Sequence, residues 1–355
     1  MELAELIKTY TLLPGTSGCE GAVASLYRTH MEPLCDRIET TPMGNVLAHV
    51  RGGDSSGPVI ALAAHMDEVG FLVADITGDG FLRLESLGRF NPLTLAASPV
   101  DVHAGDKVLP GIIGAVPPHH LQGAGLPEIS DLFVDVGASS REEISRMGVQ
   151  LGDPVIPATR FHYDGQSRRI FTKALDDRIG VASMIALAER IAGTQLPCRV
   201  VCCATVQEEV GIRGAEALSR HLQADVVLVL EGAPADDTPG INASSQTRVG
   251  GGAHVRIYDP RMIAHRGLLR YVRELVSRRE LRVQETVRRN GGTDGGSLHL
   301  SGGGIPSIVF GVPVRYAHSH NAMCCIDDFT DLLELLVCFC REFNQDACSN
   351  ILSVV

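Results

Sequence analysis

The stretch RIFTKALDDRIGVASMIALAERIAG, residues 169–193, decides the fold class of this chain of 355 residues. Residues 169–175 form a short apolar run that predicts a buried strand, and residues 177–193 carry apolar side chains at helical spacing. Asp176 and Asp177 lie at the junction. In open α/β sheets, ligands gather where strands end and helices begin. The stretch therefore predicts an α/β fold with a polar site at this junction.

The same alternation of strands and helices continues on both sides of this stretch. Upstream we expect helices at 3–10 and about 20–34, and strands at 45–50 and 58–65. Downstream we expect strands at 198–206, 224–232, 253–259 and 305–312, and helices at 212–222, 265–279 and 327 to about 344. Strands that alternate with helices indicate a mixed sheet flanked by helices on both faces.

The region from residue 91 to residue 157 has a different composition. It holds eight of the chain's 18 prolines, which excludes long helices there, and its apolar runs are short and β-like. Its one helical signal is a capping box that begins at Ser140. We therefore predict a small β-barrel-like domain at residues 69–164, inserted into an α/β domain formed by residues 1–68 and 165–355.

Charge and composition exclude several classes of protein. The chain has 42 acidic and 31 basic residues, a net charge of −11 and no long basic run, so we expect no nucleic-acid partner. No apolar stretch is long enough for a membrane span, and the first residues lack the pattern of a secretory signal. The ten cysteines are expected to be reduced thiols. These features predict a cytoplasmic protein.

Acidic residues and histidines form clusters at the ends of five predicted elements. The clusters are His65 with Asp67 and Glu68, Asp176 with Asp177, Glu208 with Glu209, Glu231, and His318 with His320. Since each follows an apolar strand, we expect all five at one edge of the sheet.

Several carboxylates at one edge repel one another unless cations neutralise them. Histidine nitrogen together with carboxylate oxygen suits zinc, cobalt or manganese. One bridging carboxylate, with one histidine and one carboxylate for each ion, makes a site for two divalent metal ions. The clusters supply this set and leave one glutamate free to take a proton from water.

Each cluster also has an ordinary structural explanation when it is taken alone. An acidic pair that opens a helix commonly caps it, and a single histidine in a loop is commonly a solvated or hydrogen-bonded residue. All five clusters at the ends of strands in one α/β scaffold are harder to explain in this way, so we favour the metal site.

Six motifs carry a resemblance to a known family, in order along nearly the whole chain. They are AHMDEVGF (64–71), VDVGASSREE (134–143), KALDDRIG (173–180), VQEEVGIRGA (206–215), GGTDGG (291–296) and RYAHS (315–319). With them the chain resembles the tetrahedral (TET-type) dinuclear metallo-aminopeptidases, which include glutamyl and deblocking aminopeptidases. Some relatives carry an endoglucanase label. The resemblance implies a zinc-peptidase-like mixed sheet.

The resemblance also implies a role for each site residue. His65, Asp176 and Glu231 would hold one metal ion, and Asp176, Glu209 and His318 the other, with Asp176 bridging. Glu208 would be the general base, and Asp67 would orient His65. The family's peptide bond after the bridging aspartate is cis, which here is Asp176–Asp177. In the family the inserted domain builds dimers that assemble into a tetrahedral dodecamer, so a homo-oligomer is expected.

Three positions depart from the family's pattern. Glu231 stands where the family most often has aspartate. The usual glutamate after the last histidine is Ala322 here, and the additional His320 offers a second candidate for the ligand assigned to His318. Asp294, in GGTDGG, is expected to shape the substrate-binding loop, with a plain glycine-rich turn as the alternative.

The function expected from these residues is metal-dependent removal of N-terminal residues from peptides. Water activated by the two ions would attack the peptide carbonyl, with Glu208 as the base. An N-acyl amino acid or N-acyl sugar deacylase on the same site is the alternative enzyme, and a catalytically degenerate scaffold is the non-enzymatic one. Glycosidases normally use two carboxylates without a metal ion, which disfavours an endoglucanase.

Overall fold

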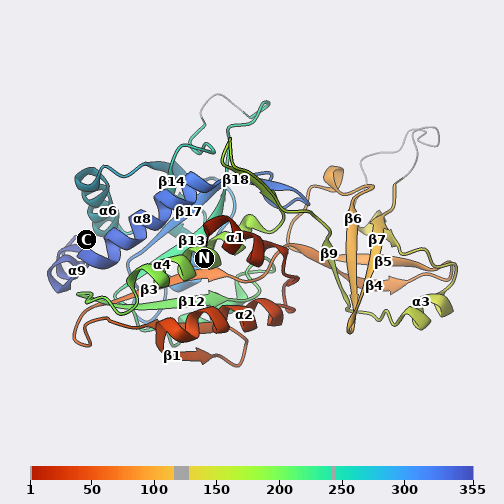
Figure 1. Ribbon diagram of the computed structural model, residues 1–355, viewed down its shortest axis with the longest axis horizontal. Coiled ribbons are helices and arrows are strands. Elements are labelled where there is room, and N and C mark those ends of the chain that lie inside the picture. Colours follow the sequence, from red (N-terminus) through yellow and green to blue (C-terminus); the bar gives the residue numbers. More distant parts are fainter. Residues whose placement is uncertain (1, 116–127, 242–244, 355) are drawn as a thin grey trace.

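The computed structural model describes residues 2–115, 128–241 and 245–354. In it a large α/β body carries a smaller β-barrel that projects from one side (Figure 1). The first and last helices, α1 (Leu3–Leu12) and α9 (Gln345–Leu352), both belong to the α/β body. The predicted mixed sheet flanked by helices, with an inserted barrel, is confirmed.

The large sheet has twelve strands in the described residues. Its order is β1 (Cys35–Thr40), β2 (Val46–Val50), β12 (Arg199–Thr205), β3 (Val59–His65), β13 (Val226–Pro234), β17 (Ser307–Arg315), β18 (Ala322–Cys325), β11 (Arg169–Thr172) and β10 (His162–Asp164). β14 (Ala253–Asp259) also pairs with β17, and β15 (Met262–Ile263) and β16 (Val283–Val287) pair with β14. The central strands β12, β3, β13 and β17 are parallel, so their carboxyl ends meet at one edge.

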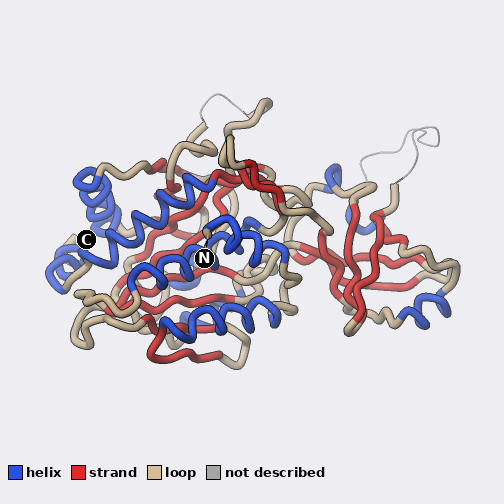
Figure 2. Tube along the Cα trace, in the orientation of Figure 1, coloured by secondary structure: helices blue, strands red, loops and turns tan. Residues whose placement is uncertain are grey.

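Helices cover both faces of this sheet. One face packs against α1, α2 (Gly21–Met31), α4 (Leu175–Ile191), α6 (Arg266–Arg279), α8 (Ile326–Glu342) and α9, and Figure 2 shows several of these helices lying across the strands. The other face packs against α5 (Arg213–Ser219) and α7 (Gly295–Leu298). Along β3, Ile60 and Leu62 enter the first core, and Ala61 and Ala63 enter the second. Burial on both faces explains why this strand is a continuous apolar run.

The barrel is a closed sheet with its own core. Its strands, in order, are β4 (Gly70–Ile76), β5 (Phe81–Leu87), β8 (Phe133–Asp135), β7 (Lys107–Ile113), β6 (Pro99–Ala104) and β9 (Pro154–Pro157). The helix predicted from the capping box is α3 (Arg141–Met147), and the Ser140 side chain accepts a hydrogen bond from the Glu143 backbone. Short 3-10 turns occur at Glu32–Leu34, Pro92–Thr94 and Ile129–Asp131.

The barrel strands span Gly70 to Pro157, and β10 pairs with β11 in the large sheet. Residues 116–127 of the predicted insert lie outside the described residues. The division of the chain at residues 69 and 164 stays a prediction.

Most predicted elements are present, and several short or polar elements were missed, among them β1, β16 and α9. Strand β1 reads CDRIET and pairs only with β2 among the described residues, so as an edge strand it lacks an apolar signal. Strand β16 is similarly polar and pairs with β14. The helix predicted from 327 to about 344 is α8, which ends at Glu342. The helix that was missed is α9, which Asn344 caps by accepting a hydrogen bond from Ala347 N at 2.9 Å.

No helix in the described residues combines the length and the apolar character that crossing a bilayer requires. All ten cysteines are free thiols.

Asp328, in the first turn of α8, fixes the turn that leads into β14. Its carboxylate accepts hydrogen bonds from the backbone N–H groups of Gly250 at 2.6 Å and Gly252 at 2.8 Å. Burial raises the pKa of Asp328 from 3.8 to about 6, although both hydrogen bonds oppose the shift. The carboxyl group therefore takes up a proton more readily in the folded chain than in the unfolded chain.

This shift predicts a pH-dependent loss of stability. The contribution of a group with a raised folded pKa is complete below its unfolded pKa and is lost as the pH rises through the folded value. We therefore expect the stability of the wild type relative to Asp328→Asn to fall by up to about 3 kcal/mol between about pH 4 and pH 7. Urea unfolding of both proteins across this range measures the difference, and parallel stability curves would contradict the assignment.

Candidate metal centre

The structure brings the seven predicted site residues to one edge of the large sheet. His65 ends β3, Glu231 lies on β13, and Asp176 lies in the first turn of α4. The other four residues lie in loops. Asp67 follows β3, Glu208 and Glu209 follow β12, and His318 follows β17. The parallel order of β12, β3, β13 and β17 is what places these segments side by side.

One cluster consists of Asp176, Glu209 and His318, whose possible ligand atoms all lie within 4.8 Å of one another. His318 Nε2 is 3.3 Å from both Asp176 Oδ2 and Glu209 Oε1. The other ring nitrogen, Nδ1, donates to the Arg89 carbonyl oxygen at 2.9 Å. His318 itself has a left-handed backbone with φ of 58°. The surrounding contacts thus hold an unfavourable backbone conformation that aims Nε2 at the two carboxylates.

A second cluster is centred on His65. Its Nε2 lies 3.3 Å from Asp176 Oδ1, so the two oxygens of Asp176 face two different histidines. His65 also groups with Glu208 and Glu209 within 4.8 Å. Asp176 therefore has the position that a bridging carboxylate needs.

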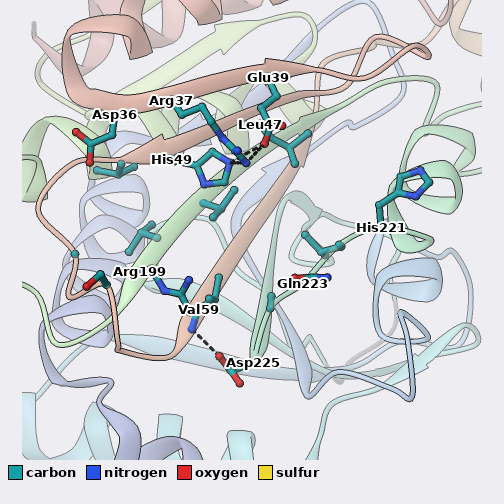
Figure 3. Close-up of a pocket in the computed structure, with 17 residues that line it drawn as sticks. Asp36, Arg37, Glu39, Leu47, His49, Val59, Arg199, His221, Gln223 and Asp225 are labelled. Atoms are coloured by element: carbon teal, nitrogen blue, oxygen red, sulfur yellow. Dashed lines mark hydrogen bonds and ion pairs between the residues drawn. The ribbon is translucent and has the colours of Figure 1, made fainter.

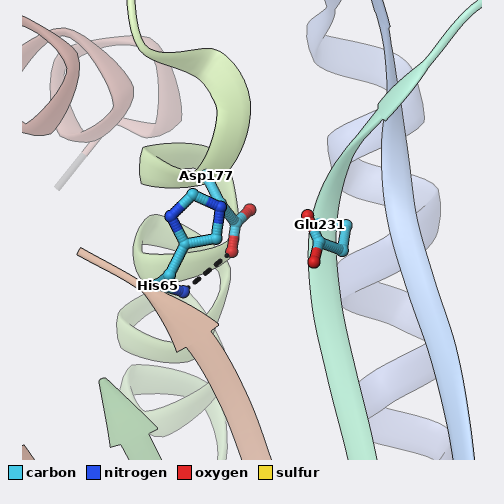
Figure 4. Close-up of side chains that lie close together, drawn as sticks. All are labelled: His65, Asp177 and Glu231. Carbon is cyan, nitrogen blue, oxygen red and sulfur yellow. Dashed lines mark hydrogen bonds between the residues drawn. The ribbon is translucent and has the colours of Figure 1, made fainter. Parts of the chain in front are cut away.

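Figure 4 shows a third grouping, in which Glu231 on β13 faces His65 and Asp177. The family resemblance assigns Asp176 rather than Asp177 to the ion that His65 and Glu231 would hold.

 In the structure the Asp177 carboxylate accepts hydrogen bonds from the backbone N–H groups of His65 at 3.2 Å and Gly180 at 3.0 Å. Asp177 thus ties α4 to the end of β3, which leaves Asp176 as the carboxylate between the histidines.

Gly232 allows β13 to approach the start of α4. A Cβ atom at this position would lie 2.7 Å from Asp176 Cα and 2.8 Å from Asp176 N. Only glycine leaves room for this contact, which brings Glu231 on β13 next to Asp176 on α4. The peptide bond between Asp176 and Asp177 is cis, as the resemblance implies.

The buried charges shift the pKa values of the cluster strongly. Burial raises the pKa of Glu208 and Glu231 well above the usual range, and it raises the pKa of Glu209 to about 7. Burial opposes protonation of His318, but Glu209 and Asp176 outweigh it and raise the pKa of His318 to about 10. Burial of these glutamates at one place thus disfavours their charged forms.

The donor set fits divalent metal ions. Asp176 Oδ1 and Glu209 Oε1 are buried and accept no hydrogen bond from the described residues, although a histidine nitrogen lies 3.3 Å from each. A buried carboxylate oxygen without a partner is costly, and a cation beside it removes that cost. Two histidine nitrogens and several carboxylate oxygens form the mixed set that suits zinc, cobalt or manganese.

Asp67 is completely buried behind the cluster. Its Oδ1 accepts a hydrogen bond from Glu208 N at 2.9 Å, and its Oδ2 accepts from Glu209 N at 3.1 Å and from the Ser17 hydroxyl at 2.6 Å. His65 Nδ1 donates to the Asp67 carbonyl oxygen at 3.1 Å, and the carboxylate lies 3.4 Å away. Asp67 therefore contacts His65 and also fixes the backbone of the loop that carries Glu208.

The cluster lies in a cleft of about 810 Å³. The cleft is lined by the proposed ligands, by Glu208 and by five arginines, namely Arg89, Arg256, Arg261, Arg288 and Arg289. Arg256 pairs with Asp259 at 3.3 Å, and Arg288 pairs with Asp236 at 3.2 Å. The other three make no ion pair with any described residue. The cleft lining therefore carries three guanidinium groups without an ion-pair partner among the described residues.

Asp294 is not part of the cleft lining. Its buried carboxylate accepts a hydrogen bond from the Thr205 hydroxyl, and burial raises its pKa to about 6. Gly291 and Gly292 of the same motif do line the cleft. The GGTDGG loop thus borders the cleft through its glycines.

Figure 3 shows a second pocket, of about 710 Å³, beside β1 and β2. Its acidic and basic side chains largely pair with one another, since Arg37 and His49 both contact Glu39, at 2.5 Å and 2.9 Å. None of the predicted site residues lines it. We therefore place the candidate site in the cleft that holds the histidines.

Comparison with known proteins agrees with this geometry. The sequence profile of the family described as M42 glutamyl aminopeptidase matches residues 44–335. The chain belongs to this family. It is an aminopeptidase of the M42 type, which confirms the predicted resemblance.

Two curated relatives and one solved structure show the extent of the similarity. The glutamyl aminopeptidase of Lactococcus lactis is 33% identical over 99% of both chains. The lysyl aminopeptidase of Pyrococcus furiosus is 30% identical, over 95% of this chain and 96% of that protein. The Pyrococcus horikoshii TET1 peptidase, whose structure assembles into a tetrahedron or a large octahedral shell, has a TM-score of 0.86 at 27% identity, covering 96% of this chain and 100% of that one.

His320 and Ala322, the two residues near His318 that differ from the family's pattern, belong to none of the clusters of possible metal ligands in the described residues. His320 is buried, its backbone carbonyl accepts a hydrogen bond from the Thr159 hydroxyl at 2.5 Å, and it belongs to none of the metal-type groups of the described residues. Burial lowers the pKa of His320 to about 4. Ala322 is the first residue of β18 and pairs with Thr172. The geometry thus favours His318 over His320 as the ligand.

Sequence reasoning missed several residues that surround the cluster. Ser17 and Glu20 lie in a loop between two helices, and nothing in their spacing points to a site more than 40 residues away. Arg89, which holds His318 through its carbonyl oxygen, comes from the barrel side of the chain. Only the folded chain brings these groups together.

Proposed function

We propose that this aminopeptidase uses two divalent metal ions and Glu208 to remove N-terminal residues from peptides. The observation that carries the proposal is the position of Asp176, whose two oxygens face His65 and His318 at 3.3 Å each. A carboxylate between two histidines, with further buried carboxylates around it, is the arrangement that a dinuclear site requires.

The residues that would hold the ions divide into two sets. His65, Asp176 and Glu231 would hold one ion, and Asp176, Glu209 and His318 the other. Zinc, cobalt and manganese all suit these ligands. When bound, the ions would supply Lewis-acid chemistry that makes water more acidic and polarises the peptide carbonyl.

Glu208 is the group that would move the proton. Its carboxylate groups with His65 and Glu209 within 4.8 Å, and it borders the cleft. Burial raises its pKa, which makes it a stronger base than an exposed glutamate. Glu208 would take a proton from the attacking water and pass it to the nitrogen of the leaving peptide.

The arginines of the cleft support a preference for acidic N-terminal residues. Arg89, Arg261 and Arg289 have no carboxylate partner in the described residues, so their guanidinium groups can pair with a substrate carboxylate. Arginine binds carboxylates through two parallel hydrogen bonds. A lysyl side chain in the same place would meet like charge.

We therefore expect kcat/KM for glutamyl p-nitroanilide to exceed that for lysyl p-nitroanilide by about 10–100-fold, the range that charge-assisted hydrogen bonds provide. Arg261→Ala and Arg289→Ala should each raise KM for the glutamyl substrate and leave leucyl p-nitroanilide unaffected. Arg270→Ala, on the exposed side of α6, is the matched control. Equal rates on lysyl and glutamyl substrates would contradict this preference.

We further propose that the chain assembles as a homo-oligomer through its inserted domain, residues 69–164, up to a tetrahedral dodecamer. The shells formed by the Pyrococcus horikoshii TET1 peptidase support this proposal. Mass photometry of the purified protein measures the assembly directly. A particle with the mass of a single chain at all concentrations would contradict it.

A further inference from the structure

We propose that the segment from Thr16 to Glu20 positions the catalytic loop at residues 207–209, with Glu20 and Ser17 as positioning residues. The inference rests on the proposed role of Glu208, but the contacts that carry it lie outside the metal cluster. Neither residue is among the predicted ligands, and neither lines the cleft.

Glu20 holds the first residue of the catalytic loop. Its Oε1 accepts hydrogen bonds from Gln207 N at 2.9 Å and from Gly18 N at 2.9 Å. The side chain is buried, with an exposed fraction of 6%. Hydrogen bonds to a buried carboxylate are stronger than those between neutral groups, and losing them leaves buried N–H groups without a partner. Glu20 therefore stabilises the conformation of the loop.

Ser17 holds the next two residues through Asp67. Its hydroxyl donates to Asp67 Oδ2 at 2.6 Å, and Asp67 in turn accepts hydrogen bonds from the backbone N–H groups of Glu208 and Glu209. Three consecutive backbone N–H groups, at residues 207, 208 and 209, therefore donate hydrogen bonds to two buried carboxylates, those of Glu20 and Asp67. The segment supplies one of these carboxylates, Glu20, and donates a hydrogen bond to the other through Ser17.

The catalytic loop needs such support because its backbone is unfavourable. Gln207 has a φ of 54°, in the left-handed region that residues other than glycine rarely adopt. A conformation of this kind persists only when surrounding contacts fix it. Glu20 supplies the contact at that residue, immediately before the proposed base.

Buried hydrogen bonds hold the residues that lead into the segment. Arg178, which is completely buried, donates through Nη2 to the Gly15 carbonyl oxygen at 3.0 Å and through Nη1 to the Tyr10 and Leu13 carbonyl oxygens at 2.8 Å and 3.1 Å. Glu68 N also donates to the Gly15 carbonyl oxygen at 3.0 Å. The first turn of α4 and the loop after β3 thus fix the chain immediately before the segment that supports the catalytic loop.

The experiment compares Glu20→Ala, Glu20→Gln and Ser17→Ala with the wild type. Tyr27→Phe is the matched control, because it removes a buried hydrogen bond from α2, the helix that follows the segment, to the Cys202 carbonyl oxygen at 3.2 Å, without touching the catalytic loop. Hydrogen exchange of the amides at residues 207–209 measures directly how firmly the backbone hydrogen bonds of the catalytic loop are held, and it needs no substrate. The melting temperature, kcat and KM for glutamyl p-nitroanilide are measured on the same proteins at saturating metal.

We expect faster amide exchange at residue 207 in Glu20→Ala and at residues 208 and 209 in Ser17→Ala. In both variants we also expect kcat to fall by about 10–100-fold with little change in KM. This is the range for residues that orient a metal ligand or a base through a hydrogen bond. Glu20→Gln should restore both readouts, because its amide oxygen can accept the hydrogen bonds made by Oε1. Tyr27→Phe should lower only the melting temperature.

Two results would overturn the proposal. Unchanged exchange at residues 207–209 in Glu20→Ala and Ser17→Ala would show that the segment does not hold the loop. A loss of kcat in Tyr27→Phe equal to that in Glu20→Ala would show that general destabilisation is the cause. Failure of the proposed function is distinguishable, since it would leave the wild type inactive while the exchange measurement still decides the positioning role.

Discussion

Replacing Glu208 by glutamine is expected to lower kcat by about 10²–10⁴-fold, the usual contribution of a general base. Glutamine keeps the size of the side chain and cannot accept the proton. Because Glu208 is not among the proposed ligands, the variant should bind the same two metal ions per chain as the wild type. Its KM should change little.

Steady-state kinetics and metal analysis of the purified variant measure both effects. Glu216→Gln is the control, since Glu216 lies on α5 with 63% of its side chain exposed and, within the described part of the chain, forms an ion pair only with Arg220, at 3.5 Å. A Glu208→Gln variant that keeps more than about a tenth of the wild-type kcat would place the base elsewhere.

Replacing Asp176 by alanine is expected to remove both metal ions together with all measurable activity. The two oxygens of Asp176 lie 3.3 Å from His65 Nε2 and His318 Nε2, so its loss would take a proposed ligand from each ion. It also leaves the buried carboxylates around it without their cation. Metal titration should show affinity lowered by more than about 100-fold at both sites.

Asp79→Ala, at an exposed turn of the barrel, is the control for this substitution and should bind metal normally. If Asp176→Ala still bound one ion at wild-type affinity, Asp176 would not bridge. Asp177, which groups with His65 and Glu231, would then be the next ligand to test.

Much of the fold follows from local patterns in the sequence. The apolar run that ends at His65 and the helical spacing after Asp177 predicted β3 and α4, because burial on both faces of a sheet and on one face of a helix leaves a periodic signal. Strands such as β1 leave no such signal, since they lie at an edge and are mostly polar. Their pairing depends on contacts with distant residues.

Part of the candidate site was also predictable from the sequence, and part was not. The clusters of acids and histidines were visible because each follows a strand, and parallel strands bring their carboxyl ends together. The sequence could not show which of the 28 arginines face the cleft. It also could not show that His318 rather than His320 points at Asp176, because the left-handed backbone at His318 and its contact with Arg89 arise only on folding.

The central claim is that a dinuclear metal site hydrolyses the bond after a free N-terminal residue. The most direct measurement strips the protein of metal, restores zinc, cobalt or manganese in steps, and follows hydrolysis of glutamyl p-nitroanilide and its N-acetylated form. We predict no hydrolysis without metal, full activity near two ions per chain, and cleavage of the free-amine substrate alone. Full activity in the metal-free protein, or cleavage of the acetylated substrate alone, would contradict the account.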